Sequence, residues 1–242
     1  MATKKNEVIE VKPIEIAEAT VQIEGTSPLI MHAWSAKAKR QILEKELKIA
    51  NVKAREVKNP LEDFVASMYW LTPQPTEFTD ESVGKALETA RFGFPVTAFK
   101  QAAIDGAYRA GAATKADLRG AFYIVGDEES YYASDLRISS DQKNIEIIPN
   151  HEIPMSMVEI HSDVPVMRED MVVLSGLSRA ADVRYRGEFR NWKANLKIRY
   201  NKNGMFTLEQ IINFLNFGGF TTGVGEWRPQ KDGEAGTFRV VA

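Results

Sequence analysis

The sequence predicts a protein of mixed structure, of the α+β class, that folds as one compact unit. Residues 19–25 and 194–200 alternate apolar and polar side chains, which is the period of a half-buried β-strand. Thr207 and Gln210 form a capping box ahead of a segment with the apolar spacing of an amphipathic helix. The 242 residues contain no cysteine. A chain of this length can bury enough surface to fold without disulfides.

The N-terminal part is predicted to be an arm followed by a strand. Residues 1–18 are rich in charged side chains and are expected to form a flexible arm. Residues 19–242 are expected to form a single domain. Its first strand begins at Ala19 and continues past Ser27-Pro28 towards Met31.

A helical insertion is predicted over about residues 35–92. Its lysine-rich first part, 35–57, is typical of an exposed helix or a mobile segment. Asn59-Pro60 supplies an N-cap and a proline at the first helical position, which predicts a helix through Leu71. Prolines end that helix, and a short acidic helix follows from Asp80.

The remaining elements alternate between helix and strand. A helix rich in small residues is expected to end at Gly111, and the helix that begins at Thr207 is expected to end at Gly218-Gly219. Strands, several of them paired as β-hairpins, are expected at 121–126, 131–138, 145–148, 155–160, 194–200 and 237–241. In the last strand, Phe238 and Val240 are predicted to point inward.

The composition indicates a cytoplasmic protein. The absence of cysteine fits a reducing compartment and excludes thiolate zinc sites and cysteine nucleophiles. The N-terminus has lysines but no apolar core of signal-peptide length, and no segment reaches the roughly 20 apolar residues of a membrane span. We therefore expect no membrane partner.

Positive charge is concentrated in two segments although the net charge is only −2. Residues 37–58 carry a local charge of +5 and residues 179–202 a local charge of +6. Such segregation can make a basic groove on an acidic body, although a charge run can also be an ordinary solvated surface. From the first segment the candidate nucleic-acid contacts are Lys37, Lys39 and Arg40.

The second segment interleaves basic and aromatic side chains. Arginine offers a planar fork to phosphate and a stacking surface to bases, and tyrosine or tryptophan adds an aromatic face. The alternative is a solvated loop with Trp192 in the core. The candidate contacts here are Arg179, Arg184, Arg186, Arg190 and Lys193.

A glycine-rich loop, residues 218–236, lies between the last predicted helix and the last strand. Phosphate-cradling loops follow a strand and open a helix, so this order argues against a dinucleotide cofactor. The loop is either a helix cap with a long turn or a bare backbone that lies against a polymer. An aromatic and a cation suited to base stacking and phosphate contact favour the polymer. The candidates are Gly223, Gly225, Trp227 and Arg228.

Catalytic groups are sparse in the sequence. No two of His32, His151 and His161 have metal-ligand spacing, and His32 follows an apolar run, as a core histidine would. Asp127-Glu128-Glu129 is more typical of a solvated turn than of a cation site, and Ser175 lacks a nucleophile-elbow context. We expect no catalytic residue, no metal and no cofactor, and therefore no enzyme.

Three features of the chain, in order, resemble the RAMP superfamily, the RNA-binding backbone subunits of CRISPR effector complexes. They are a first strand that ends near Ser27-Pro28, a proline-led helix in FPVTAFKQAAIDGAYRA, and the C-terminal strand, helix, glycine loop and strand. The resemblance implies a ferredoxin-like (RRM-like) βαββαβ core with a lysine-rich insertion and extra β-hairpins. It also implies subunits that stack along a single strand, with the glycine loop and arginines on the phosphate backbone. Nucleases of the family often carry a histidine near the first helix, which residues 95–111 lack.

The sequence therefore predicts a non-enzymatic protein that binds single-stranded DNA or RNA and self-associates along it. As a whole, the sequence resembles those of small bacteriophage proteins. If the chain is encoded by a bacteriophage, we expect it in the cytoplasm of the host. The alternative is a structural or interaction protein, either a phage assembly component or an inhibitor that mimics a complex subunit.

Overall fold

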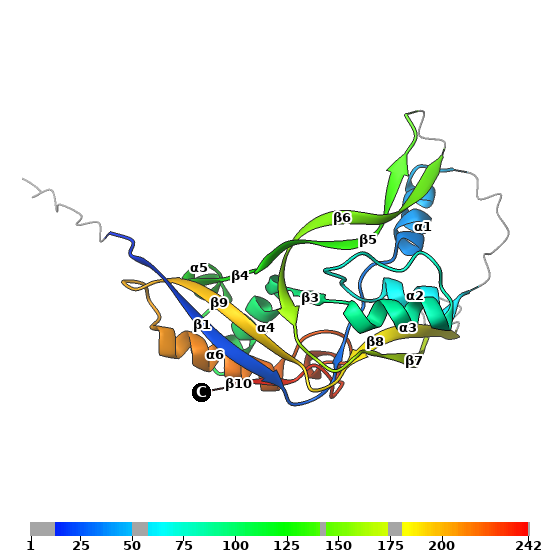
Figure 1. The fold of residues 1–242 in the computed structure, drawn as a ribbon. Coiled ribbons are helices and arrows are strands. Elements are labelled where there is room, and N and C mark those ends of the chain that lie inside the picture. Colours follow the sequence, from blue (N-terminus) through cyan, green and yellow to red (C-terminus); the bar gives the residue numbers. More distant parts are fainter. Residues whose placement is uncertain (1–12, 50–57, 141–143, 174–180, 242) are drawn as a thin grey trace, which may run out of the picture.

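The computed structural model describes residues 13–49, 58–140, 144–173 and 181–241, and they form a mixed α+β fold with antiparallel sheets (Figure 1). The predicted α+β class is thereby confirmed. Residues 1–12 of the predicted arm lie outside the described residues, whereas 16–18 already belong to the first strand.

The largest sheet has four strands in the order β10-β1-β9-β4, and all neighbours are antiparallel. Its strands are β1 (Ile16–Gly25), β4 (Phe122–Val125), β9 (Lys193–Asn201) and β10 (Phe238–Val241). One face is apolar: Leu196 and Ile198 of β9 are fully buried, whereas Asn195 and Arg199, whose side chains point to the other face, are exposed. The predicted strands at 121–126, 194–200 and 237–241 are confirmed, and Phe238 points inward.

Two helices of equal length, α4 (Val96–Arg109) and α6 (Leu208–Thr221), pack against this apolar face. The glycines allow a close helix contact, because a Cβ on Gly218 would lie 2.2 Å from the backbone oxygen of Ala102. The predicted end of α6 at Gly218-Gly219 is therefore wrong. The helix continues to Thr221, and these glycines are needed for packing rather than for termination. Gly111, with φ 70°, does follow the end of α4 as predicted.

The insertion contains three helices with side-chain N-caps from Ser35, Asn59 and Thr79. They are α1 (Ala36–Glu46), α2 (Pro60–Ala66) and α3 (Asp80–Thr89). The predicted helix through Leu71 is too long. The helix ends at Ala66 because Trp70 forms isolated antiparallel β-bridges with Phe92 and Tyr132. The ring of Trp70 is buried, and its Nε1–H donates to the backbone oxygen of Val65 at 2.9 Å.

Two three-stranded sheets complete the fold, in the orders β2-β8-β7 and β3-β6-β5. Their strands are β2 (Leu29–Ile30), β3 (Phe92–Pro95), β5 (Glu128–Ile138), β6 (Ile145–Ile160), β7 (Val166–Val173) and β8 (Ala181–Phe189). The predicted strands at 145–148 and 155–160 are one long strand, β6, which extends with β5 away from the body (Figure 1). Two short helices, α5 (Lys115–Ala121) and the 3₁₀ helix η1 (Pro229–Lys231), complete the described elements.

Buried aromatic rings connect the sheets. Phe92 packs on Trp70 and Phe189, and Phe99 packs on Trp192 and Phe238. Trp192 is 1% exposed, and its ring nitrogen donates to the oxygen of Ser27 at 2.8 Å. Trp192 is therefore a core residue, as the alternative placed it, but the segment before it is not the solvated loop of that alternative, because it contains strand β8 with Arg186 and Phe189 buried.

Candidate nucleic-acid interface

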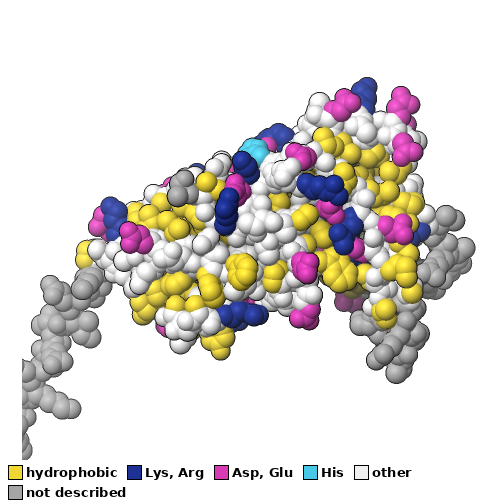
Figure 2. Space-filling view, turned by 90° about the horizontal axis from the view of Figure 1, so that it is seen from below, with side chains coloured by type: hydrophobic (Ala, Val, Ile, Leu, Met, Phe, Trp, Pro, Cys, Tyr) yellow, Lys and Arg dark blue, Asp and Glu magenta, His cyan; other side chains and the backbone are white. Residues whose placement is uncertain are grey.

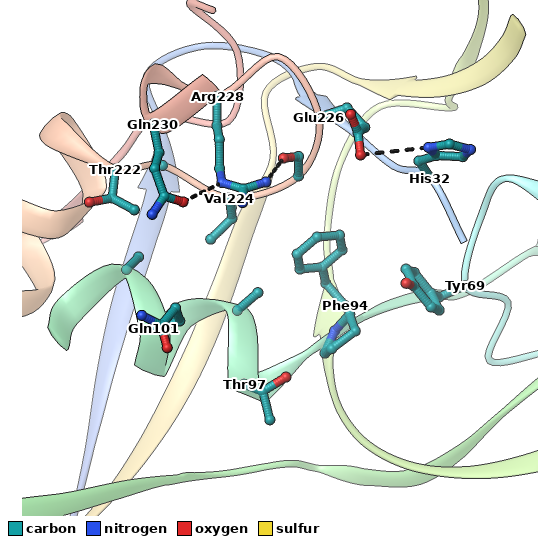
Figure 3. Close-up of a pocket in the computed structure, with 15 residues that line it drawn as sticks. His32, Tyr69, Phe94, Thr97, Gln101, Thr222, Val224, Glu226, Arg228 and Gln230 are labelled. Carbon is teal, nitrogen blue, oxygen red and sulfur yellow. Dashed lines mark hydrogen bonds and ion pairs between the residues drawn. The ribbon is translucent and has the colours of Figure 1, made fainter. Parts of the chain in front are cut away.

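A cavity of about 470 Å³ lies between the loop that follows α6 and the first turns of α4 (Figure 3). The loop supplies Gly223, Val224, Gly225, Glu226 and Arg228, and α4 supplies Thr97, Ala98 and Gln101. His32 and Tyr69 close its far side. Three of the residues predicted in the glycine loop therefore line one cavity.

The glycines of this loop are explained by contacts within the chain. Gly223 and Gly225 have φ angles of 65° and 79°, a region that favours glycine. A Cβ on Gly225 would lie 2.5 Å from the oxygen of Ile30, and the next residue, Glu226, donates its backbone N–H to that oxygen. The long-turn interpretation thus explains why these positions are glycine, and the same turn places the backbone on the cavity wall.

Arg228 is held in place by neighbours from its own loop. It donates from Nη1 to the oxygen of Gly225 at 2.7 Å and from Nε to Gln230 at 3.1 Å. Gln230 in turn donates to Asp105 of α4 at 2.7 Å. Neither hydrogen-bond partner is a carboxylate, and the nearest described acidic group in the cavity wall is Glu226, whose pKa the charge of Arg228 helps to lower.

The first turn of α4 adds further polar groups. Its N-cap is Pro95, no side chain caps this end, and no acidic residue lies in its first turn. The free N–H groups and the helix dipole make such an end attractive to an anion. Thr222, which lines the cavity and is 1% exposed, has a hydroxyl without a hydrogen-bond partner among the described residues. A ligand or water at this position would satisfy it.

A histidine–carboxylate pair borders the cavity. His32 Nδ1 lies 3.5 Å from Glu226 Oε1, and both side chains are partly exposed. The hydrogen bond with His32 lowers the pKa of Glu226 against the opposing effect of burial, and the charges of Arg186 and Arg228 lower it further. Burial raises the pKa of Tyr69 to about 12, with smaller contributions from Tyr131 and Glu226. Tyr69 is therefore a neutral hydroxyl and Glu226 an ionised carboxylate.

His32 was expected in the core, and that expectation is wrong. Its side chain is 34% exposed and lies beside Glu226 of the loop, although its chain neighbours Met31 and Ala33 are buried. Tyr69, Thr97 and Gln101 also line the cavity but were not predicted from the sequence. Only Thr97 had a local signal, since it follows the proline that leads α4.

Trp227 lies beside the cavity rather than in its wall. It is 38% exposed, has φ 54°, and hydrogen-bonds to Asp170 of β7. The loop is thus attached to the sheet that carries the predicted arginines. Part of the indole remains open to a stacking partner.

Two of the predicted arginines, Arg184 and Arg186, lie on strand β8, and several charges of this second basic segment are paired. Arg186 is 3% exposed and donates to Asp170 at 2.8 Å. Arg168 of β7 donates to both Asp170 and Glu188. Arg190 binds Glu188 at 2.8 Å. Burial by itself raises the pKa of Asp170, but hydrogen bonds from Arg168, Arg186 and Trp227 outweigh it and lower the pKa.

The other predicted contacts are dispersed. Lys37 binds Glu62 at 2.6 Å, Lys39 lies 3.9 Å from Asp135, and Arg40 lies 3.5 Å from Glu44. None of these three cations of α1 lines the cavity. In Figure 2, basic and acidic side chains are interspersed across the face shown, without a continuous basic stripe.

Three positions remain from the second basic segment. Arg184 lies 3.6 Å from Asp182. Lys193 is exposed on β9 and forms no ion pair with a described residue. Arg179 lies outside the described residues. The structure thus joins the glycine loop to Arg186 through Trp227 and Asp170, but it does not bring all the predicted cations to one surface.

Within the described ranges, no three histidine, aspartate or glutamate side chains are grouped so that they could hold a metal ion. No helix in the same ranges is long and apolar enough to cross a membrane.

Comparison with known proteins assigns no family. No family model matches the chain, and no curated protein matches it. Among solved structures, the chain is similar to the crystal structure of Cmr6 from Pyrococcus furiosus, with 9% sequence identity and a TM-score of 0.31. The match covers 95% of this chain and 100% of that chain. A likeness this weak transfers no residue roles.

Proposed function

We propose that the chain is a non-enzymatic protein that binds single-stranded nucleic acid, and that one nucleotide unit of the strand occupies the cavity beside the glycine loop. The observation that carries the proposal is the shared cavity wall. The loop backbone, the uncapped end of α4 and the fixed cation of Arg228 all border one space. Together they offer N–H donors and positive charge to a phosphate.

The size and lining of the cavity fit a nucleotide. About 470 Å³ lies within the range of small-ligand pockets. Tyr69 and Phe94 provide aromatic surface, and Gln101 provides an amide group that can pair with a base edge. Glu226 is the one carboxylate in the described lining, and His32, Arg186 and Arg228 compensate its charge.

The chain order supports a ferredoxin-like core. The elements β1, α4, β4, β9, α6 and β10 follow each other as βαββαβ, and both helices cover one face. We propose that α1–α3 and the other two sheets are insertions into this core. Self-association along the strand and a cytoplasmic location stay predictions from the sequence alone.

A salt-dependent titration with single-stranded oligonucleotides tests the proposal. Each phosphate contact contributes a slope of about −0.7 in log affinity against log salt. Arg228→Ala should lower the affinity and make the slope shallower by about that amount. The matched control is Arg137→Ala, which removes an exposed arginine from β5, outside the cavity lining. A flat salt response, or equal binding by both variants, would contradict the proposal.

The non-enzymatic part has its own test. Labelled DNA and RNA should remain intact after prolonged incubation with the protein and Mg²⁺ or Mn²⁺. Metal-dependent cleavage of the labelled strands by freshly purified protein would refute it.

The alternative, an interaction protein, is favoured by a separate observation. Strand β7 exposes apolar side chains, among them Met171 at 76% and Val173 at 68%. Exposed apolar side chains on an edge strand are typical of surfaces that pair with another protein chain.

A further inference from the structure

Asp105 is a carboxylate buried in the middle of helix α4. It is 2% exposed, and its helix neighbours Ile104 and Gly106 are buried as well. A carboxylate is seldom buried without hydrogen-bond donors that offset its desolvation. Burial by itself raises the pKa of Asp105, but hydrogen bonds from Lys115 and Gln101 outweigh it and lower the pKa. Asp105 is therefore an ionised group that can only accept hydrogen bonds.

The two oxygens of Asp105 have partners from different parts of the chain. Oδ1 accepts from Nζ of Lys115 on α5 at 2.6 Å, and Oδ2 accepts from Nε2 of Gln230 at 2.7 Å. Gln230 belongs to η1, within the glycine-rich loop and 125 positions further along the chain. The second bond therefore attaches the loop to α4, which supplies the other wall of the cavity.

Gln230 connects Asp105 to Arg228. Because Asp105 can only accept, the amide of Gln230 turns its NH₂ group towards Asp105 and its oxygen towards the loop. That oxygen accepts from Nε of Arg228 at 3.1 Å, and Nη1 of Arg228 donates to the backbone oxygen of Gly225 at 2.7 Å (Figure 3). Nη2 of Arg228 has no hydrogen bond to a described residue. The guanidinium is thus held at two nitrogens, and the third is available to a ligand in the cavity.

We propose that Asp105 is a positioning residue of the candidate site, which acts through Gln230 to hold the guanidinium of Arg228 towards a phosphate of the bound strand. The inference rests on the proposed function. It predicts the opposite sign from simple electrostatics. Removal of a carboxylate near an anionic ligand strengthens binding by charge alone. Loss of the relay Asp105–Gln230–Arg228 instead leaves the arginine to be ordered when the ligand binds, which weakens binding.

Titration of the full-length protein with a single-stranded oligonucleotide tests the relay. Asp105→Ala and Gln230→Ala should each weaken binding about fivefold, the effect of one lost hydrogen bond. Asp105→Asn keeps a side-chain oxygen for Gln230 and should bind nearly as tightly as the wild-type protein. Glu88→Ala is the matched control, because it removes an exposed carboxylate from α3, outside the cavity lining. This control should not weaken binding.

A double variant separates positioning from a purely structural role. In the Arg228→Ala background, Asp105→Ala should cause no further loss of affinity, because the relay has no guanidinium left to orient. If Asp105→Ala does not fold, the same comparison with Gln230→Ala decides, since Gln230 is partly exposed.

Two outcomes overturn the relay and leave the proposed function standing. One is weak binding by Arg228→Ala together with normal or tighter binding by Asp105→Ala and Gln230→Ala. The other is an additive loss of affinity in the double variant. Normal binding by Arg228→Ala overturns the proposed function, and this inference with it.

Discussion

In the sequence, the glycine loop and the arginine-bearing strand β8 looked equally suited to bind nucleic acid. In the structure, their arginines lie in different environments. The loop presents Arg228 to a cavity, held by a carbonyl and an amide. Strand β8 and its neighbour direct Arg186 into a buried set of ion pairs with Asp170.

The comparison shows that the number of basic side chains in a segment is not the number that are free to contact a phosphate. Asp170 and Glu188 were not conspicuous in the sequence, but the pairing of β7 with β8 brings both beside the arginines. A desolvated arginine that is already paired offers little to a phosphate. Three predictions sharpen this contrast.

The largest effect is expected on stability, at Arg186. Arg186→Ala leaves Asp170 buried with one of its cations removed, which should cost about 3–5 kcal/mol. Arg184→Ala breaks only a partly exposed pair and should cost about 0–1 kcal/mol. Urea unfolding of both variants measures the difference. Similar losses would mean that the two arginines are equivalent, and the contrast would fail.

The second effect is expected on binding, at Trp227. Trp227→Ala should weaken single-strand binding by about 1–3 kcal/mol and leave the salt slope nearly unchanged, because stacking releases no counterions. Trp192→Ala instead opens a cavity in the core and should cost about 3–5 kcal/mol of stability. The two variants are compared by titration and thermal unfolding. If Trp227→Ala binds normally, the indole is not part of the interface.

The smallest effect is a difference in acid sensitivity. The lowered pKa of Asp170 means that its stabilising contribution is present above the ordinary aspartate pKa and is lost as pH falls through its folded-state value. In Asp170→Asn, the unfolding free energy should therefore fall less between pH 6 and pH 3 than in the wild-type protein. Glu226→Gln should change the pH dependence less, since Glu226 is 41% exposed. Identical pH profiles for all three proteins would contradict the assignment.

Much of the secondary structure followed from local signals. The caps at Asn59 and Thr207 begin helices where expected, and the alternation in 194–200 is a strand. The errors have tertiary causes. Gly218 continues a helix because α4 approaches too closely for a side chain, and Trp70 leaves a helix to join a sheet.

The residues of the candidate site also fall into two groups, those with a local signal in the sequence and those without one. The sequence identified the glycine loop, because a run of glycines beside an aromatic and an arginine is visible locally. It could not identify His32, Tyr69 or Gln101, since nothing in their own segments shows that they meet that loop.

The sequence by itself determined the α+β class, the capped helices and the positions of most strands, because caps and periodicity act between residues a few positions apart. Only the tertiary structure decided which charges are available. Ion pairing depends on distances between residues far apart in the chain: Arg186 is neutralised by Asp170 from the neighbouring strand, whereas Arg228 is held by its own loop and remains open to the cavity.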